Sequence, residues 1–201
     1  MPHQCGAIAQ LGEHLLCKQG VRGSIPRSST TYQMIKFPST ISLIGMAGAG
    51  KTSVGQALAE RINYKFIDTD KVIEDMHKSS LQELLERYGY LKLRDIEEKE
   101  VLGLSIDGSI ISTGGSVVYG SEAMNFLKET STIVYLEMTL EQIHKRNINF
   151  SNRGFANHPD QSIEEVFAER TELYKKYANL TVSNNAEIDD CVDLIIDRLN
   201  Q

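Results

Sequence analysis

The sequence predicts an α/β protein in which helices cover both faces of a parallel β-sheet. Short β-branched apolar runs alternate with longer segments of helical spacing over residues 40–199, the alternation typical of this class. The first run, TISLI at residues 40–44, is apolar enough to be buried on both faces, as strands of parallel sheets are. A glycine-rich turn follows it directly and precedes a helical pattern.

The elements follow one another in a simple order. Val54, Leu58 and Ile62 recur at helical spacing after the glycine-rich turn, which places one buried stripe on a helix. Strands are expected at residues 40–44, 64–67, 109–112, 132–136 and 180–182. Helices are expected at residues 52–62, 71–76, 81–88, 91–104, 121–128, 140–146, 162–177 and 188–199. The polar residues 147–159 contain Asn, Gly, His and Pro and predict a mobile loop.

Composition excludes several classes of protein. The chain has 201 residues, of which 41% are hydrophobic and 24% charged, as in an ordinary globular domain. No apolar run approaches the roughly 18–20 residues of a membrane span, and the net charge of −6 argues against a nucleic-acid surface. Cys5, Cys17 and Cys191 are too scattered for a disulfide framework. The five histidines and three cysteines do not form a set of four ligands with the spacing of a zinc site, so no zinc site is predicted. We expect a cytoplasmic monomer with neither membrane nor nucleic acid as partner.

Residues 1–33 do not resemble the rest of the chain. They carry scattered glycines and no sustained period, and they lack the apolar core of a secretory signal. A disordered tail and a mitochondrial presequence are two readings. The third is that residues 7–14, 15–21 and 22–26 can be encoded by DNA resembling the D-arm, anticodon arm and T-arm of a tRNA gene, in that order and in one frame. We therefore expect that residues 1–33 are not part of the native protein and that Met34 is the start of the domain at residues 34–201.

Deleting residues 1–33 is expected to leave the melting temperature and the turnover unchanged, because the predicted fold begins after Met34. Mass spectrometry of the protein from its native cells is expected to find an N-terminus at or near Met34. Native peptides from within residues 6–27 would overturn the tRNA interpretation.

A phosphate-binding motif lies between the first strand and the first helix. Residues 45–52, GMAGAGKT, match G-x-x-x-x-G-K-[ST] in full. Glycines allow the tight turn that points successive N–H groups at phosphate oxygens, and the helix N-terminus adds partial positive charge. Lys51 is expected to bridge the β- and γ-phosphates of ATP and Thr52 to ligate Mg²⁺. The backbone of Gly48, Ala49, Gly50 and Ser53 completes the predicted cofactor site.

Two further motifs follow strand ends. Asp68 and Asp70 lie two residues apart, so in an extended segment their side chains project to the same side. One can hold the metal and the other can accept a substrate proton; the simpler alternative is a solvated turn with a helix cap. Thr113-Gly114-Gly115-Ser116 follows the next strand and can bring backbone close to a ligand. Strand ends of a parallel sheet meet at one edge, which favours a common site.

Taken together, these residues resemble the shikimate kinase family. The resemblance covers about residues 41–199 and rests on GMAGAGKTSVG, FIDTD, LRDIEEKE, ISTGGS, the Asn152-Arg153 pair and ERTELYKKYANLTV. It implies a P-loop kinase fold with a five-stranded parallel sheet flanked by helices, a substrate-binding region near residues 71–105 and a mobile lid near residues 148–160. It also implies ATP and Mg²⁺ as cofactors and phosphorylation of the 3-hydroxyl of shikimate in aromatic amino-acid biosynthesis.

The resemblance also implies roles for individual residues. Lys51 contacts the phosphates, while Thr52 and Asp68 hold the metal. Asp70 binds the substrate hydroxyl and acts as base, and the Gly115 backbone touches the ring hydroxyls. Arg94 and Arg170 hold the substrate carboxylate, and Arg153 reaches ATP from the lid. Two guanidiniums suit a carboxylate because arginine donates in bidentate fashion at any pH.

Departures from the family pattern gather on the substrate side. Leu93 stands where Phe is usual, Tyr90 where Glu is usual, Ser116 where a third glycine is usual, Gly154 where Pro is usual and Glu172 where Pro is usual. Two rival functions therefore stay open: a related kinase for another small polyol or hydroxy acid, and a catalytically silent nucleotide-binding module. The intact Lys51, Thr52, Asp68 and Asp70 argue against a silent module.

Overall fold

The computed structural model describes residues 37–146, 154–185 and 187–201. The strands are β1 (Thr40–Ile44), β2 (Lys65–Asp68), β3 (Ser109–Ser112), β4 (Thr132–Glu137) and β5 (Leu180–Ser183). The α-helices are α1 (Lys51–Ile62), α2 (Thr69–His77), α3 (Leu81–Leu102), α4 (Ser121–Thr130), α5 (Leu140–Lys145), α6 (Ile163–Tyr177) and α7 (Ile188–Leu199), and a short 3₁₀ helix, η1, spans Val117–Tyr119.

The five strands form one parallel sheet in the order β2-β3-β1-β4-β5. All residues of β1 are buried, and its Leu43 pairs with Ser112 of β3 on one side and Val134 of β4 on the other. Because all strands run in one direction, β1, β2 and β3 end at the same edge of the sheet. This confirms the predicted fold class and places the phosphate-binding loop, Asp68 and the turn after Ser112 beside one another.

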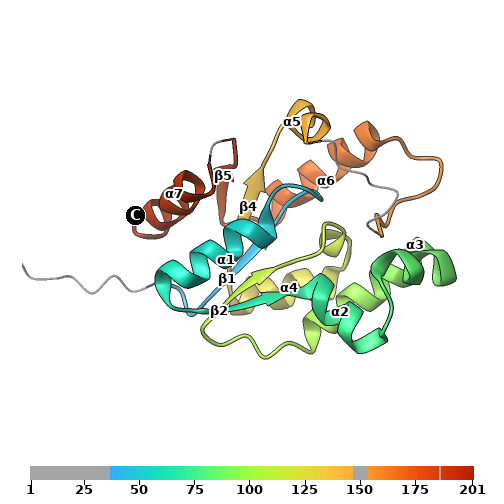
Figure 1. Ribbon diagram of the computed structural model, residues 1–201, viewed down its shortest axis with the longest axis horizontal. Coiled ribbons are helices and arrows are strands. Elements are labelled where there is room, and N and C mark those ends of the chain that lie inside the picture. Colours follow the sequence, from blue (N-terminus) through green and yellow to red (C-terminus); the bar gives the residue numbers. More distant parts are fainter. Residues whose placement is uncertain (1–36, 147–153, 186) are drawn as a thin grey trace, which may run out of the picture. The chain divides into compact units, whose positions relative to one another are not determined.

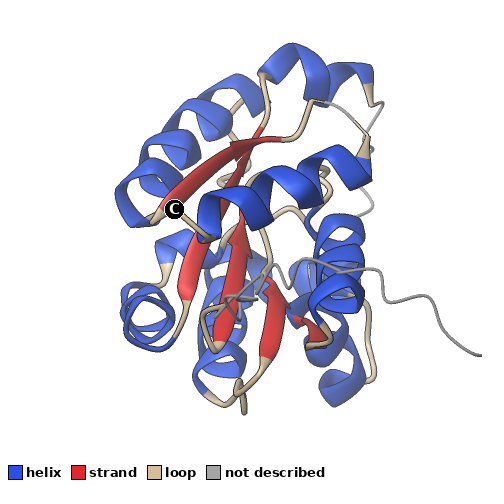
Figure 2. Cartoon of the chain, turned by 90° about the vertical axis from the view of Figure 1, so that its left-hand side faces the viewer, coloured by secondary structure: helices blue, strands red, loops and turns tan. Residues whose placement is uncertain are grey.

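Helices cover both faces of the sheet, with α1 and α7 on one face and α4 and α6 on the other (Figures 1 and 2). The main core consists of apolar residues from β1, β3, β4 and the inner faces of these helices. A second, smaller cluster joins α2 to α3 and includes Ile73, Leu84 and Leu93. Leu93 is fully buried there, so this departure from the family pattern belongs to the core of the cluster between α2 and α3.

Helix α2 begins at Thr69, earlier than predicted, because the Asp68 carboxylate accepts a hydrogen bond from the N–H of Asp70 and caps the helix. The two helical segments expected at residues 81–88 and 91–104 lie within α3, where they are separated at Gly89, whose φ of 79° and ψ of 166° are not helical. That left-handed backbone is one that glycine adopts without strain.

The predicted lid lies only partly within the described residues. Residues 154–160 of it are described, whereas Arg153 lies outside them. Among the helices of the described ranges, none is both long and apolar enough to cross a membrane.

Candidate active site

A cavity of about 860 Å³ opens at the carboxyl edge of the sheet. Its walls come from the phosphate-binding loop, the start of α2, α3, the turn after β3, residues 154–156 and α6. The residues that line it include Gly48, Gly50, Lys51, Thr52, Ser53, Asp68, Asp70, Glu97, Ser112, Gly115, Ser116, Phe155, Ala156 and Arg170. The structure thus gathers at one cavity residues that the sequence analysis assigned to both nucleotide and substrate.

The phosphate-binding loop has the backbone that its glycines predict. Gly48 and Gly50 have φ values of 80° and 84°, which only glycine adopts freely. Gly50 precedes α1, and no described side chain caps that helix. The first N–H groups of α1 therefore have no side-chain acceptor there, which is the arrangement that favours an anion at a helix N-terminus.

Lys51 is buried and bonded within its own loop. Its Nζ donates to the carbonyl oxygens of Gly45 and Met46 at 2.7 and 2.8 Å. Burial is the main cause that lowers the pKa of Lys51 to about 8, and the negative charge of Asp70 opposes that shift. Lys51 is therefore charged at pH 7, with its ammonium at the wall of the cavity.

Thr52 and Asp68 form the oxygen pair expected of a magnesium site. The Thr52 hydroxyl donates to Asp68 Oδ2 at 2.8 Å and lies 3.5 Å from the hydroxyl of Ser112. Hydroxyl and carboxylate oxygens are hard ligands of the kind that Mg²⁺ takes from proteins, usually one or two together with phosphates. The donor set therefore fits this ion. Ser112 was not predicted, because a serine within a buried strand has no distinguishing pattern.

Asp70 lines the cavity, but the reason given from the sequence was wrong. It lies in the first turn of α2 and not in an extended segment beside Asp68. The strand ends at Asp68 because that carboxylate caps the helix. Asp70 Oδ1 lies 2.9 Å from the point where a Cβ on Gly114 would stand. Gly114 therefore has to be glycine for the carboxylate to reach the floor of the cavity.

A second carboxylate, Glu97 of α3, lies beside Asp70. Its Oε1 lies 2.8 Å from the same point over Gly114, and its Oε2 accepts a hydrogen bond from the hydroxyl of Ser116. Glu97 is 5% exposed. Burial is the main cause that raises the pKa of Glu97 to about 7, and the charge of Asp70 raises it further. Glu97 was not predicted, because it is one of several acidic residues in LRDIEEKE and no local pattern distinguishes it.

Glu97 is expected to make the stability of the protein depend on pH. Its raised pKa means that the folded protein keeps a proton between pH 4.5 and about 7 that the unfolded chain has lost, so the free energy of unfolding falls as the pH rises through this window. Relative to Glu97→Gln, which cannot ionise, the wild type should lose about 1–3 kcal/mol between pH 5 and pH 8. Urea denaturation of both proteins over this range measures the difference. Parallel stability curves would contradict the assignment.

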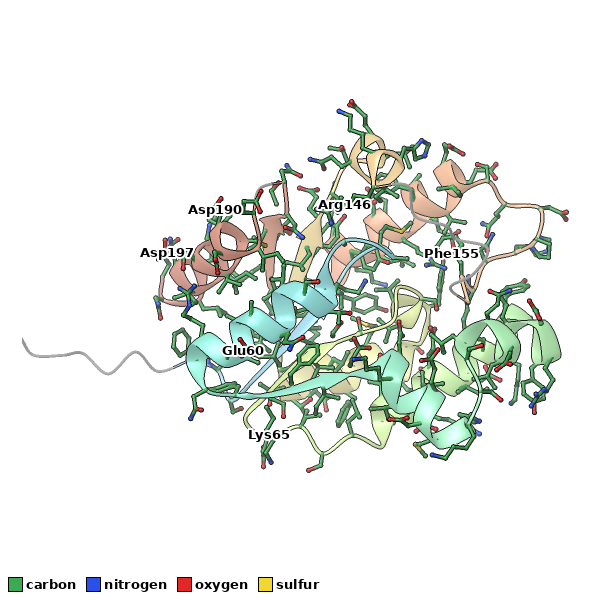
Figure 3. All side chains as sticks on the ribbon, in the orientation of Figure 1. Glu60, Lys65, Arg146, Phe155, Asp190 and Asp197 are labelled. Carbon is green, nitrogen blue, oxygen red and sulfur yellow. The ribbon has the colours of Figure 1, made fainter. Side chains whose placement is uncertain are left out.

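Arg94 and Arg170 converge on one oxygen atom. The Nε and Nη2 groups of Arg94 donate to the carbonyl oxygen of Ala156 at 3.2 and 2.9 Å, and Nη2 of Arg170 donates to the same atom at 2.8 Å. Residues 154–156, here called the strap, bring this carbonyl to the arginines. Figure 3 shows Phe155 of the strap between α6 and α3. Its ring centroid lies 4.5 Å from the guanidinium carbon of Arg170.

The strap packs against the start of α3, in the predicted substrate-binding region. Gly154 has a φ of 59°, and a Cβ there would lie 2.6 Å from the Cβ of Leu81. Its N–H donates to Gln82 Oε1 at 3.0 Å. The glycine that replaces the usual proline is thus required by a close approach to α3.

Several of the predicted site residues do not line the cavity with their side chains. Arg94 is half-buried behind the strap, and of the two arginines only Arg170 lines the cavity. Ala49 is buried, and its N–H donates to Met46, so it is not part of the wall. The Gly115 carbonyl accepts a 2.6 Å bond from Tyr174 Oη, which fixes the turn and leaves its other atoms to face the cavity. Arg153 lies outside the described residues.

Arg146 and Asn184 support the phosphate-binding loop, and neither was predicted. Arg146 donates to the carbonyl of Gly48 at 2.8 Å and to that of Asn184 at 3.3 Å. The amide of Asn184 donates to the carbonyl of Ala49 at 2.6 Å. Figure 3 shows Arg146 beside this loop. Their positions follow from the sheet order, since β5 lies next to β4, and no local motif marks them.

Comparisons with known proteins agree with this geometry. Residues 47–200 match the model of the family described as shikimate kinase. A shikimate kinase of Clostridium beijerinckii is 34% identical over 164 residues, which is 79% of this chain and 96% of the relative. The solved shikimate kinase of Acinetobacter baumannii in complex with shikimate superposes with a TM-score of 0.75 at 28% identity, covering 81% of this chain and 93% of that one.

A second solved structure gives the same result. The shikimate kinase of Aquifex aeolicus superposes with a TM-score of 0.70 at 29% identity, and covers 80% of this chain and 95% of that chain. The residues matched by the family model, 47–200, include Lys51, Asp70 and Arg170. The chain therefore belongs to the shikimate kinase family, whose members use ATP to phosphorylate an alcohol group.

Proposed function

We propose that this protein transfers the γ-phosphoryl group of ATP to the 3-hydroxyl of shikimate. The observation that carries the proposal is that one cavity joins Lys51, Asp70 and Arg170. The reaction needs a cation to bind the phosphates, a carboxylate to accept the proton of the hydroxyl, and a guanidinium to bind the substrate carboxylate. Lys51, Asp70 and Arg170 supply these groups in that order. The two arginines, which meet on a single acceptor, match the two oxygens of an acid substrate.

The residues of the cavity have distinct roles in this proposal. Lys51 neutralises the phosphates, and the free N–H groups at the start of α1 hold their oxygens. Asp70 accepts a hydrogen bond from the attacking hydroxyl and takes its proton as the new P–O bond forms and the bond between the γ-phosphorus and the β,γ-bridging oxygen breaks, so that ADP leaves. Arg94 and Arg170 hold the carboxylate, so that the ring presents one hydroxyl to Asp70. Catalysis is then mainly positioning and charge stabilisation of an in-line transfer.

Thr52 and Asp68 are the residues that would hold Mg²⁺, since their oxygens lie 2.8 Å apart. The ion, when bound, neutralises charge on the phosphates of ATP. The hydroxyl of Ser112, 3.5 Å from that of Thr52, would help to orient the threonine hydroxyl.

Two of the substrate-side residues that depart from the family pattern, Glu172 and Ser116, are compatible with this function. Glu172 is exposed while Arg170 is buried, so Glu172 lies on the other side of α6 and does not neutralise the arginine. Ser116 bonds to Glu97 and therefore stays in the floor of the cavity. These two departures from the family pattern therefore do not remove either arginine from the proposed carboxylate-binding pair.

A coupled assay of ADP release, run with and without shikimate, tests the proposal. Shikimate-dependent release of ADP is the expected result. Release with another small polyol or hydroxy acid but not with shikimate would favour a related kinase. Binding of ATP with no release for any acceptor would favour a silent nucleotide-binding module.

We also propose that the enzyme works as a cytoplasmic monomer. The support for the location is the acidic composition, with a net charge of −6, and the small number of cysteines, three scattered along the chain. Size-exclusion chromatography with light scattering and cell fractionation test the two parts separately. A dimer, or recovery outside the cytoplasm, would refute the corresponding part.

A further inference from the structure

Tyr119 stacks directly on one of the two converging arginines. The guanidinium carbon of Arg94 lies 3.5 Å from the centroid of the Tyr119 ring, which is the distance of face-to-face contact. Tyr119 is the last residue of η1, and Arg94 follows the Gly89 kink in α3. The sequence analysis did not single out Tyr119, and its contact with Arg94 arises only from the packing of these two elements.

The stack restricts the directions in which Arg94 can donate. A guanidinium donates only in its own plane, and Tyr119 covers one of its faces. Within that plane Nε and Nη2 both reach the Ala156 carbonyl. The guanidinium carbon of Arg170 lies 5.3 Å from the same tyrosine ring. One ring therefore contacts both arginines that share the Ala156 oxygen.

Tyr119 makes this contact with its ring and not with its hydroxyl. Its phenol oxygen is buried and has no hydrogen-bond partner among the described residues. Buried tyrosines usually satisfy this group, so hydrogen bonding does not explain the residue. Burial lowers the pKa of Arg94, and Tyr119 opposes this shift. The guanidinium loses contact with water in the stack and is stabilised instead by the negative face of the ring.

Tyr90 contacts the same guanidinium from farther away. Its ring centroid lies 5.2 Å from the guanidinium carbon of Arg94. Because the attraction falls with distance, Tyr119 has the larger effect of the two.

We propose that Tyr119 is a positioning residue, which holds the plane of Arg94 so that Arg94 and Arg170 present their N–H groups to the substrate carboxylate together. The proposal rests on the proposed function, since it takes the carboxylate to be the ligand of these arginines. Tyr119 itself touches no reacting atom. Its effect should appear in the KM for the acid substrate and not in the chemistry of transfer.

Three variants distinguish the effect of the Tyr119 ring face from that of its hydroxyl and from the effect of losing any tyrosine that faces an arginine. Tyr119→Leu removes the aromatic face, whereas Tyr119→Phe keeps it. Tyr88→Leu is the control, because the Tyr88 ring also faces an arginine, with its centroid 5.7 Å from the guanidinium carbon of Arg87. Tyr88 is 51% exposed and does not line the cavity. Tyr119→Leu is expected to raise the KM for shikimate about 3- to 10-fold with little change in kcat or in the KM for ATP. Tyr119→Phe and Tyr88→Leu should behave as the wild type.

A neutral substrate gives a sharper comparison. The methyl ester of shikimate lacks the charge that Arg94 is proposed to hold, so Tyr119→Leu should leave kcat/KM for the ester unchanged. An equal loss for acid and ester, or a loss in Tyr119→Phe as large as in Tyr119→Leu, would overturn the proposal.

A measurement without substrate keeps the proposal separate from the proposed function. The Nε–H resonance of Arg94, assigned by its disappearance in Arg94→Lys, should be shifted upfield by the ring current of Tyr119. The shift should persist in Tyr119→Phe and vanish in Tyr119→Leu. If the wild type does not phosphorylate shikimate, the proposed function fails while this measurement still decides whether Tyr119 positions Arg94. An unchanged resonance in Tyr119→Leu would refute the positioning role.

Discussion

Replacing Lys51 with alanine or methionine is expected to lower kcat for phosphoryl transfer by about 10²–10³-fold, the cost of losing one positioned cation at developing charge. Lys51 lies in the wall of the cavity at the start of α1, where the phosphates of ATP would bind. Its pKa of about 8 leaves it protonated at pH 7. A steady-state assay at saturating shikimate, with ATP varied, measures the loss.

The stability of the two variants has to be measured beside their activity, since Lys51 is also bonded within the protein. Its ammonium donates to the carbonyls of Gly45 and Met46. The Met46 carbonyl keeps the N–H of Ala49 as a donor, but a Gly45 carbonyl left unpaired costs about 1–3 kcal/mol. The variants also no longer bury a charged group, which offsets part of this cost. Both variants should therefore fold, with a lowered melting temperature. Methionine keeps the length of the side chain and is the better probe of charge alone. Turnover within tenfold of the wild type in a folded variant would refute the P-loop assignment.

Replacing Arg170 or Arg94 is expected to lower kcat/KM for shikimate about 10- to 100-fold, with ATP binding little changed. Each substitution removes a charge-assisted hydrogen bond from a partly desolvated site. Arg→Lys should be nearly as damaging as Arg→Ala, because an ammonium cannot reproduce the planar fork. Titration of shikimate in the presence of ADP and Mg²⁺ measures binding by the wild type and by each variant.

Arg170 needs a control for packing that Arg94 does not. It is 1% exposed and among the largest fully buried side chains of the described residues, so truncation to alanine also leaves a cavity in the core. Arg170→Met keeps most of the volume and removes the guanidinium together with its hydrogen bond to the Ala156 carbonyl. Equal binding of shikimate by the wild type and by folded Arg94 and Arg170 variants would rule out the carboxylate clamp and leave only the kinase assignment.

The amino-acid sequence by itself determined the class of fold and the nucleotide side of the site. Strand and helix periods are local properties, and the alternation of apolar runs with amphipathic segments predicts a parallel sheet wherever it occurs. GMAGAGKT is contiguous, so the loop, the helix that follows it and Lys51 come together through neighbouring backbone alone. The positive φ of Gly48 and Gly50 is what such a motif requires.

The substrate side depended on tertiary structure, because its residues come from separate elements. Glu97 meets Asp70 over Gly114 only because α2 and α3 pack beside the turn after β3. Tyr119 meets Arg94, and Arg146 and Asn184 meet the phosphate-binding loop, across gaps that no local pattern spans. Even Asp70, which was predicted, lies on a helix and not on a strand, since capping by Asp68 decided where α2 begins. Contacts between distant segments are set by how the elements pack, and periodicity describes each element alone.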